Sequence, residues 1–410
     1  MSLYLWISLQ KIEKLYFFME MKMLGFRWIA THAGAPDSKD FSSAKDQLRD
    51  KSGNTLYQDI LKLNPGLPEP SSQLKADVSA WVQKLNGAAA VVLVHGFSYD
   101  PKTEEDEENK HDAFNTVYAN PKDLKTPFTS WLPLVGETDE SGNQVRDVAV
   151  PFSWTTLGKL KDYGRAGWEN SYQYGAFDLT VQASHALALI ISTLSHVGAT
   201  IDLLAHSLGT RLTMQTLSLL TQNGLGNAVR RVVLMGGAEL SIDARDASLD
   251  GGYDVFSLVN RGDTVLHWGA SKAVHPFRHN NTEQSLVLGR DGMRATPHWI
   301  DIQTNRKDNE TGRRREFDNW FIDNFKTTLS EDGINGRGTH WSYYMQPGNR
   351  EFLKALFSRE TISASGLRAA GLIDGVDRNN YGDLTASVPP TPQTFAERRA
   401  IIDEDSQGER

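Results

Sequence analysis

The chain has 410 residues, enough to bury a large core in one domain with insertions or in two smaller domains. Its formal net charge of −8 argues against nucleic acid as the main partner. The absence of cysteine excludes disulfides, thiol catalysis and cysteine-based metal sites. It is compatible with a reducing or an oxidising compartment, and we expect a cytoplasmic protein.

Residues 1–85 are expected to form an N-terminal extension. The stretch Met1–Ala30 is apolar but interrupted by charged residues, and it has neither the pattern of a secretory signal peptide nor an unbroken membrane span. Its apolar residues recur at helical spacing, which predicts an amphipathic helix that packs on the protein or precedes a true start at Met21 or Met23. A membrane anchor is the alternative, but we expect no stable membrane insertion.

The next segment, residues 31–75, is polar and carries one short helical stretch around Leu56–Leu63. A helix is predicted at Leu74–Leu85, ending near Gly87. The continuous apolar run Ala88–Val94 is typical of a strand covered on both faces. The first strand of a buried sheet is therefore expected here.

His95, Gly96 and Phe97 follow this strand directly. Gly96 lets the backbone approach a substrate closely because it has no side chain. For His95 we favour a hydrogen bond to the backbone, with catalysis as the alternative.

Residues 98–144 are interpreted as a long insertion. Its acidic run Glu104–Glu108 is typical of a solvated, mobile loop, with a site for a metal or a cationic substrate as the alternative. The segment Phe128–Val135 is apolar enough to pack beside the active site.

From there on, apolar strands alternate with helical segments. Asp178 is expected to cap a helix that continues to Leu194. Such alternation predicts an α/β fold with a doubly wound, mostly parallel sheet and right-handed crossovers. Strands are expected at Val148–Phe152, Ile201–Leu204, Arg231–Met235, Tyr253–Val259 and Trp299–Gln303.

The predicted strand Ile201–Leu204 runs into Ser207, and a helix-compatible run follows from Thr210 to Leu220. This pattern predicts a strand–turn–helix elbow whose strained corner presents the serine hydroxyl. Small residues on both sides, Ala205 and Gly209, let strand and helix approach, although Ala205 stands where glycine is usual. The amide of Leu208 is expected to point at a developing oxyanion.

A serine hydroxyl needs an imidazole to take its proton, and the imidazole needs a carboxylate to fix its tautomer. An elbow of this kind implies the chain order serine, acid, histidine. Asp263 lies in the loop directly after the predicted strand Tyr253–Val259 and is the candidate acid. A turn role after Gly262 is its alternative, and Glu239 and Asp243 are rival acids.

His340 is the candidate base. It lies in a glycine-rich loop after the last predicted strand and before a helix expected at Asn349–Phe357. Four other histidines follow the acid. His267 lies too near it in the sequence, and His298 lies at the wrong edge of the sheet. His275 and His279 bracket a proline, with no carboxylate in helical register for a zinc site.

A second insertion is expected at residues 304–335. We interpret Arg313–Arg315 as solvated surface rather than an anion site. Four aromatic residues recur at helical spacing and are interpreted as packing or part of a cap; these are Phe317, Trp320, Phe321 and Phe325. The sequence has no internal repeat.

Together these motifs resemble the α/β-hydrolase superfamily of serine esterases and lipases, over roughly residues 88–358. The resemblance is carried by Val91–Phe97 with its His-Gly pair, by Ala205–Gly209, by Asp263 after a strand and by His340. It departs from the usual pattern in Ala205 and in the two insertions.

The resemblance implies a catalytic triad of Ser207, Asp263 and His340. It also implies an oxyanion hole formed by the amides of Phe97 and Leu208. The run Phe152-Ser153-Trp154, followed by Gly158 and Tyr163, is similar to a bacterial branch of the superfamily whose physiological function is unassigned.

We therefore expect a hydrolase domain at residues 86–360, followed by a C-terminal tail at 361–410. It would cleave a carboxylic ester of a small molecule or lipid through an acyl-enzyme, with no metal or organic cofactor implied. Alternatives on the same triad are a lipase, thioesterase or amidase, including a membrane-bound lipase held by Met1–Ala30. A non-catalytic binding protein with the insertions as docking surfaces is the alternative from another class.

Overall fold

A computed structural model describes residues 28–31, 47–50, 55–58, 66–97, 99, 112–154, 156, 176–248, 251–266, 286–293, 298–304, 312–333, 338–359 and 361–369. The acidic run Glu104–Glu108, residues Gly158 and Tyr163, and most of the N-terminal stretch and the C-terminal tail lie outside these ranges. The side chains of Arg313–Arg315 and Phe317 are also outside the description.

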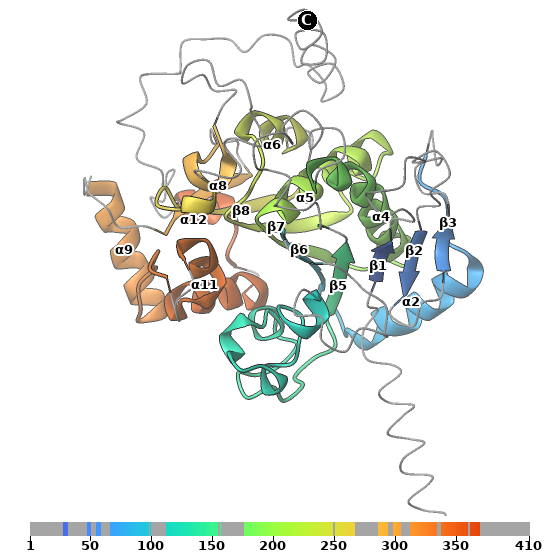
Figure 1. Ribbon diagram of the computed structural model, residues 1–410, viewed down its shortest axis with the longest axis horizontal. Helices are drawn as coiled ribbons and strands as arrows, with labels where there is room; N and C mark the ends of the chain where they lie inside the picture. The colour runs from blue at the N-terminus through green and yellow to red at the C-terminus, as the bar shows by residue number, and fades with distance from the viewer. Residues whose placement is uncertain are drawn as a thin grey trace, which may run out of the picture.

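The described residues form one sheet with the strand order β3-β2-β1-β5-β4-β6-β7-β8-β9 (Figure 1). The six strands from β5 to β9 in this order are parallel, and their residues are almost entirely buried. This confirms the predicted α/β fold with a parallel sheet between helices. The six strands are β4 (Ala90–Val94), β5 (Ala149–Trp154), β6 (Ile201–His206), β7 (Val229–Met235), β8 (Asp254–Val259) and β9 (Trp299–Gln303).

Three short strands from the N-terminal segment extend the sheet beyond β5. The strand β1 (Trp28–Thr31) runs parallel to β5, and β2 (Gln47–Asp50) and β3 (Thr55–Gln58) continue antiparallel. The helix expected around Leu56–Leu63 is wrong at its start, because Leu56 lies in strand β3, which pairs with β2. The amphipathic helix expected near the N-terminus depends on apolar residues from Leu5 to Met23, which lie outside the described residues.

Helices α4 (Ala176–His196), α5 (Leu208–Gln222) and α6 (Ser241–Ser248) lie along one side of the sheet (Figure 1). The predicted helix before β4 is α2 (Ser72–Lys84), where the Ser71 hydroxyl accepts the Leu74 amide and caps the first turn. Asp178 does not cap α4, since that helix already begins at Ala176.

The second insertion contains α9 (Gly312–Phe325), which packs on the C-terminal helix α11 (Pro347–Ser358). The Phe321 and Phe325 rings lie 5.5 and 5.8 Å from the Phe352 ring, which confirms a packing role for these two aromatics. The remaining C-terminal elements are α8 (Leu288–Asp291), η10 (Thr339–Trp341), α10 (Ser342–Met345) and α12 (Ala364–Ala369).

The described part of the first insertion contains four single turns, of which the last packs against α11 (Figure 1). The guanidinium of Arg350 on α11 is buried and donates hydrogen bonds to the carbonyl oxygens of Phe128 and Tyr344, each at 2.8 Å. This ties the insertion to the C-terminal helix. The turns are η3 (Ala113–Asn115), η4 (Pro121–Asp123), η5 (Pro127–Thr129) and η6 (Leu132–Val135).

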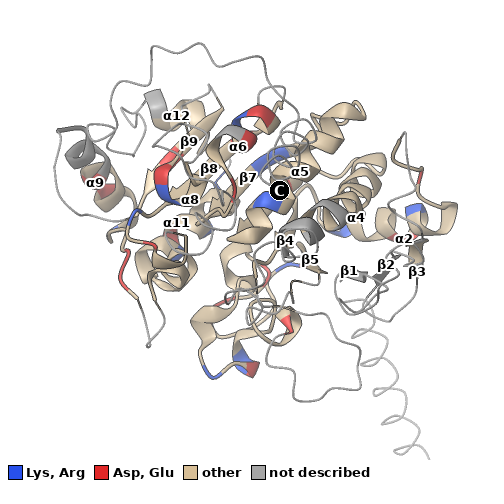
Figure 2. Ribbon diagram, turned by 45° about the horizontal axis from the view of Figure 1, so that its top comes forward, with Lys and Arg blue, Asp and Glu red and all other residues tan. Residues whose placement is uncertain are grey.

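Acidic and basic residues are dispersed over several elements of the described ribbon rather than collected on one (Figure 2). Within the described ranges, no helix is long and apolar enough to cross a membrane.

Candidate active site

Ser207 occupies the sharp corner between β6 and α5. Its backbone angles are φ 55° and ψ −125°, a conformation that side-chain-bearing residues rarely adopt and that is costly unless the surroundings enforce it. The corner is held by two hydrogen bonds to the β7 end, from the Ser207 amide to the Met235 oxygen and from the Ala238 amide to the Ser207 oxygen, both at 3.0 Å. The strand–turn–helix corner predicted from the sequence is present.

The Ser207 hydroxyl makes no capping bond to α5, although serine at this position commonly accepts a helix amide. The hydroxyl is therefore left available at the start of a 15-residue helix. Leu208 is the first residue of that helix, so its amide is one of the N-terminal donors without a partner inside the helix. These donors and the helix dipole favour negative charge at this end.

Two glycines allow the ends of β4 and β6 to approach this closely. A Cβ on Gly96 would lie 2.7 Å from the Ser207 Cβ and 3.3 Å from its Oγ. A Cβ on Gly209 would lie 2.6 Å from the Val94 oxygen. The chain leaves β4 for β5 on one side and β6 for β7 on the other, so Gly96 and Ser207 sit where the winding direction reverses. Ligands of open parallel sheets bind at such points.

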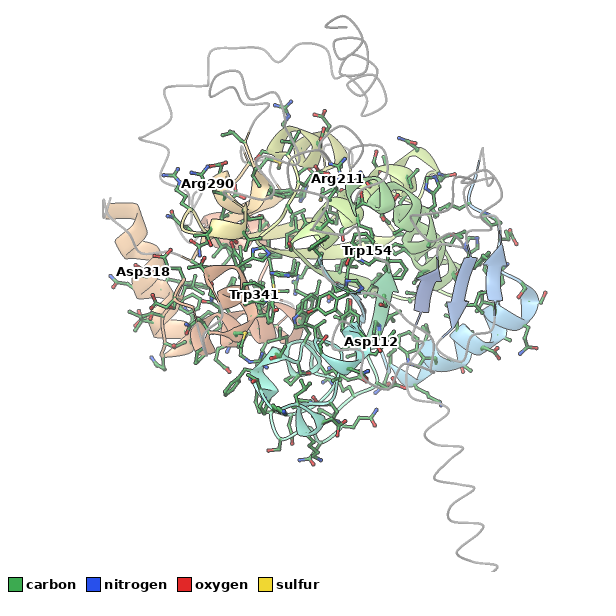
Figure 3. The ribbon with its side chains drawn as sticks, viewed as in Figure 1. Asp112, Trp154, Arg211, Arg290, Asp318 and Trp341 are labelled. Atoms are coloured by element: carbon green, nitrogen blue, oxygen red, sulfur yellow. The ribbon has the colours of Figure 1, made fainter. Side chains whose placement is uncertain are left out.

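His95 is a buried structural residue, as expected. Its Nε2 accepts the Trp154 amide at 3.1 Å, so its Nδ1 carries the proton and donates to the Gly96 oxygen at 2.8 Å. Burial lowers the pKa of His95 to about 3, although the hydrogen bond to Gly96 by itself raises it, so the ring stays neutral. Trp154 lies at the end of β5, toward the middle of the molecule (Figure 3).

The bond from His95 fixes the orientation of the Gly96–Phe97 peptide group. In a trans peptide the carbonyl and the following amide point in opposite directions. Because the Gly96 oxygen is held toward the His95 ring, the Phe97 amide points away from that ring. The two amides predicted as oxyanion donors thus belong to backbone segments that meet at Ser207.

Asp263 and His340 are in direct contact, 77 positions apart in the chain. His340 Nδ1 donates to Asp263 Oδ2 at 2.6 Å, and both side chains are buried. Asp263 lies in the loop after β8 and His340 in η10, which follows β9 and the second insertion. With the proton on Nδ1, Nε2 of a neutral His340 is free to accept one.

The Asp263 carboxylate receives three hydrogen bonds. Besides His340, the Tyr343 hydroxyl lies 3.1 Å from Oδ2 and the Leu266 amide 3.0 Å from Oδ1. Burial by itself raises the pKa of Asp263, but the His340 imidazole and these donors outweigh it, and the pKa lies below its usual value. The carboxyl group is therefore ionised at neutral pH.

His206, the residue before Ser207, packs against His340. Their ring centroids are 4.6 Å apart, and His206 Nε2 donates to the His340 backbone oxygen at 3.0 Å. The Trp131 ring lies 6.2 Å from the His206 ring, so the first insertion does pack beside this group, as expected for Phe128–Val135. Phe128 itself is 42% exposed.

The structure thus joins Asp263 to His340, and joins His340 to the elbow through His206. Ser207 Oγ has no hydrogen bond to any of the described residues. Such contacts are often long in a protein without substrate and shorten in the complex. Trp341, next to His340 in the chain, lies in the same central region, whereas Asp318 on α9 lies at the periphery (Figure 3).

The rival acids and bases are placed elsewhere. Glu239 pairs with Arg211 of α5 at 2.6 Å, and Asp243 lies on α6. The side chain of His298 is 58% exposed and lies near Asp254 at the N-terminal end of the strands. This is the edge of the sheet that argued against His298 as the base. His267, His275 and His279 fall outside the described residues.

Two residues of this group, His206 and Tyr343, were not predicted from the sequence. His206 precedes Ser207 and Tyr343 lies three residues after His340, but nothing in the local sequence indicates the residues that they contact. Among the described residues, no group of three or more histidine, aspartate or glutamate side chains could hold a metal ion.

No protein-family model matches the chain, and a search of curated proteins finds no match to it. The likeness to the α/β-hydrolase superfamily therefore depends on the motifs and on the geometry described above.

Proposed function

We propose that the protein is a serine hydrolase of the α/β-hydrolase type that cleaves a carboxylic ester through an acyl-enzyme. The observation that supports this most directly is the buried Asp263–His340 pair at the same sheet edge as Ser207. The second is the positive φ at Ser207, whose hydroxyl makes no hydrogen bond to the described residues. Backbone strain of this kind is concentrated at functional sites.

In this proposal His340 Nε2 takes the Ser207 proton while Oγ attacks the ester carbonyl. Asp263 holds the ring by its Nδ1 bond and stabilises the imidazolium without taking its proton, because the acid is kept ionised by its three donors. His340 then returns the proton to the leaving alcohol.

The negative oxygen of the tetrahedral intermediate is stabilised by the Phe97 and Leu208 amides. The Leu208 amide is at the N-terminus of α5, where the helix dipole adds to the effect. The Phe97 amide is oriented by the His95–Gly96 bond. Water then attacks the acyl carbonyl while His340 takes its proton, and His340 returns that proton to Ser207 Oγ as the bond to Oγ breaks and the carboxylic acid leaves.

A fluorophosphonate probe tests the proposal, since it reacts with an activated serine without needing the right substrate. Wild type should be labelled, and Ser207→Ala should not. Ser218→Ala, on the same helix α5, is the matched control and should be labelled like wild type. Labelling that persists in Ser207→Ala would contradict the assignment. A panel of acyl esters, thioesters and amides then separates an esterase from a lipase, thioesterase or amidase.

One observation favours a second candidate, a non-catalytic binding protein built on the same fold. Ser207 Oγ has no hydrogen bond to His340 among the described residues, so the proton path is not closed. This candidate predicts that the folded wild-type protein reacts no faster with the probe than Ser207→Ala does.

A further inference from the structure

The Tyr343 hydroxyl contacts the oxygen through which Asp263 binds His340. Tyr343 Oη lies 3.1 Å from Asp263 Oδ2 and 3.3 Å from the Gly289 carbonyl oxygen. The hydroxyl has one proton and both neighbours can only accept, so the proton is shared between them. Asp263 Oδ2 therefore has two donors, the imidazole and the phenol.

Both donors come from one short segment, η10 followed by α10, so their spacing is fixed by the backbone. The Tyr343 ring is completely buried and lies against Gly236, where a Cβ would collide with the ring. The Gly289 oxygen also accepts the Asn260 amide at 2.8 Å, and the Asn260 oxygen accepts the Asp263 amide at 3.1 Å. Tyr343 thus contacts the side chain of the acid directly and is linked to its loop through the Gly289 oxygen.

The negative charge of Asp263 is fully buried, and among the described residues its one ion-pair partner is His340. A buried carboxylate is costly unless hydrogen bonds disperse its charge. Burial, and then the charge of Asp263, raise the pKa of Tyr343 well above its usual value, so the phenol keeps the proton that it donates. The other titratable groups that face this cluster are His206, from the end of β6, and Glu331, whose charge also acts on Tyr343.

We propose that Tyr343 is a positioning residue of this site, an inference that depends on the function proposed above. Its hydroxyl holds Asp263 Oδ2 against His340 Nδ1 and withdraws part of the carboxylate charge from the imidazole. A carboxylate without this donor binds the imidazolium more tightly, so His340 takes up its proton at a higher pH and is a poorer base near neutrality. A purely structural role would instead need only the bond to Gly289.

The test compares Tyr343→Phe with Tyr253→Phe. Both tyrosines are buried, and Tyr253 donates to the Ala247 oxygen at 2.9 Å, at the opposite end of β8 from the loop of Asp263. The first readout is the far-downfield proton NMR signal of His340 Nδ1–H, assigned by its loss in His340→Gln and recorded without substrate. The second is the pH profile of kcat/KM.

In Tyr343→Phe we expect the Nδ1–H signal to move further downfield and the acid limb of the profile to move up by about 0.5 to 1 pH unit. Tyr253→Phe should change neither. Replacing Tyr343 by 3-fluorotyrosine keeps the hydroxyl but makes it a stronger donor, and should move both readouts in the opposite direction. Unchanged signals in both Tyr343 variants would overturn the proposal. Since the NMR readout needs no turnover, it decides the role of Tyr343 even if Ser207 proves unreactive.

Discussion

His206 Nε2 donates a hydrogen bond to the backbone oxygen of His340 across 134 positions of the chain, at 3.0 Å. The bond joins the residue before the corner serine to the loop that carries the candidate base. Burial, and then the neighbouring His340 imidazole, lower the pKa of His206 to about 3. The ring is therefore neutral, and its single proton stays on Nε2, where the bond requires it.

Replacing His206 should therefore misplace His340. In His206→Phe the ring volume is kept but the donor is lost, and we expect kcat to fall by roughly threefold to tenfold with little change in KM. His206→Gln carries an amide nitrogen where Nε2 stood and should retain more of the rate. Steady-state kinetics on the best ester of the panel measures both variants. Equal rates for Phe, Gln and wild type would show that this bond does not position the loop.

The parallel core was predictable because each of its strands is a short apolar run between helical segments. Val91–Val94 and Ile201–Leu204 are buried on both faces, so their sequences carry a strong signal. The edge strands β2 and β3 carry almost none. Each has four residues and a mixed polar sequence without a clear periodicity. Strand β3 is defined by its pairing with the neighbouring β2, which its own sequence does not indicate.

Of the site, the local parts were visible in the sequence and the contacts across the fold were not. The small residues around Ser207 indicate a tight corner, because only a few residue types fit one. Asp263 and His340 could be placed at one edge from the strand order alone. Tyr343 could not be placed in this way, because its contact with Asp263 joins residues 80 positions apart and depends on how the backbone continues from η10 into α10.

The Asp263–His340 bond gives the largest expected effect of a single isosteric change. Asp263→Asn keeps the size of the side chain but presents an amide group that favours the other tautomer of His340, with the proton on Nε2. We expect kcat/KM to fall by roughly 10³- to 10⁴-fold. The rate of fluorophosphonate labelling should fall with it, which makes the test independent of the substrate.

Glu239→Gln is the matched control, because Glu239 is the rival acid on the neighbouring strand end and is buried to a similar degree. It should leave the reactivity of Ser207 close to that of wild type. If Glu239→Gln removes labelling and Asp263→Asn does not, the acid has been assigned to the wrong carboxylate.

Gly96 should not tolerate even a methyl group. In Gly96→Ala the new Cβ would lie 2.7 Å from the Ser207 Cβ and 2.9 Å from the His206 oxygen, so the corner or the β4 loop must shift. We expect at least a roughly hundredfold loss of labelling rate, because a displacement of about 1 Å at a reacting group is that costly. Gly66→Ala is the control, since its Cβ would meet only the Asn223 side chain at an ordinary 3.8 Å. Both variants are compared with wild type by labelling kinetics and thermal unfolding.

Two of the buried histidines, His95 and His206, make stability depend on pH in a definite direction. The pKa values of His95 and His206 are about 3 in the folded protein, against an ordinary 6.5. Between these values the unfolded chain binds a proton at each position and the folded protein does not. The free energy of unfolding therefore falls as the pH drops from 6.5 toward 3, by up to about 1.4 kcal/mol per pH unit for each histidine.

Urea unfolding of wild type, His95→Gln and His206→Gln at pH 7, 6, 5 and 4 measures this. Both variants start less stable at pH 7, because each loses buried hydrogen bonds or packing. Only the slope is diagnostic, and it should be shallower than that of wild type in each variant. The carboxylates contribute the same slope to all three proteins. Asp263 is one of them: its pKa is lowered in the folded protein, so its contribution to the free energy of unfolding is lost as the pH falls through that pKa. Parallel curves would mean that the two rings take up protons in the folded protein as readily as in the unfolded chain, so the lowered pKa values of His95 and His206 would be wrong.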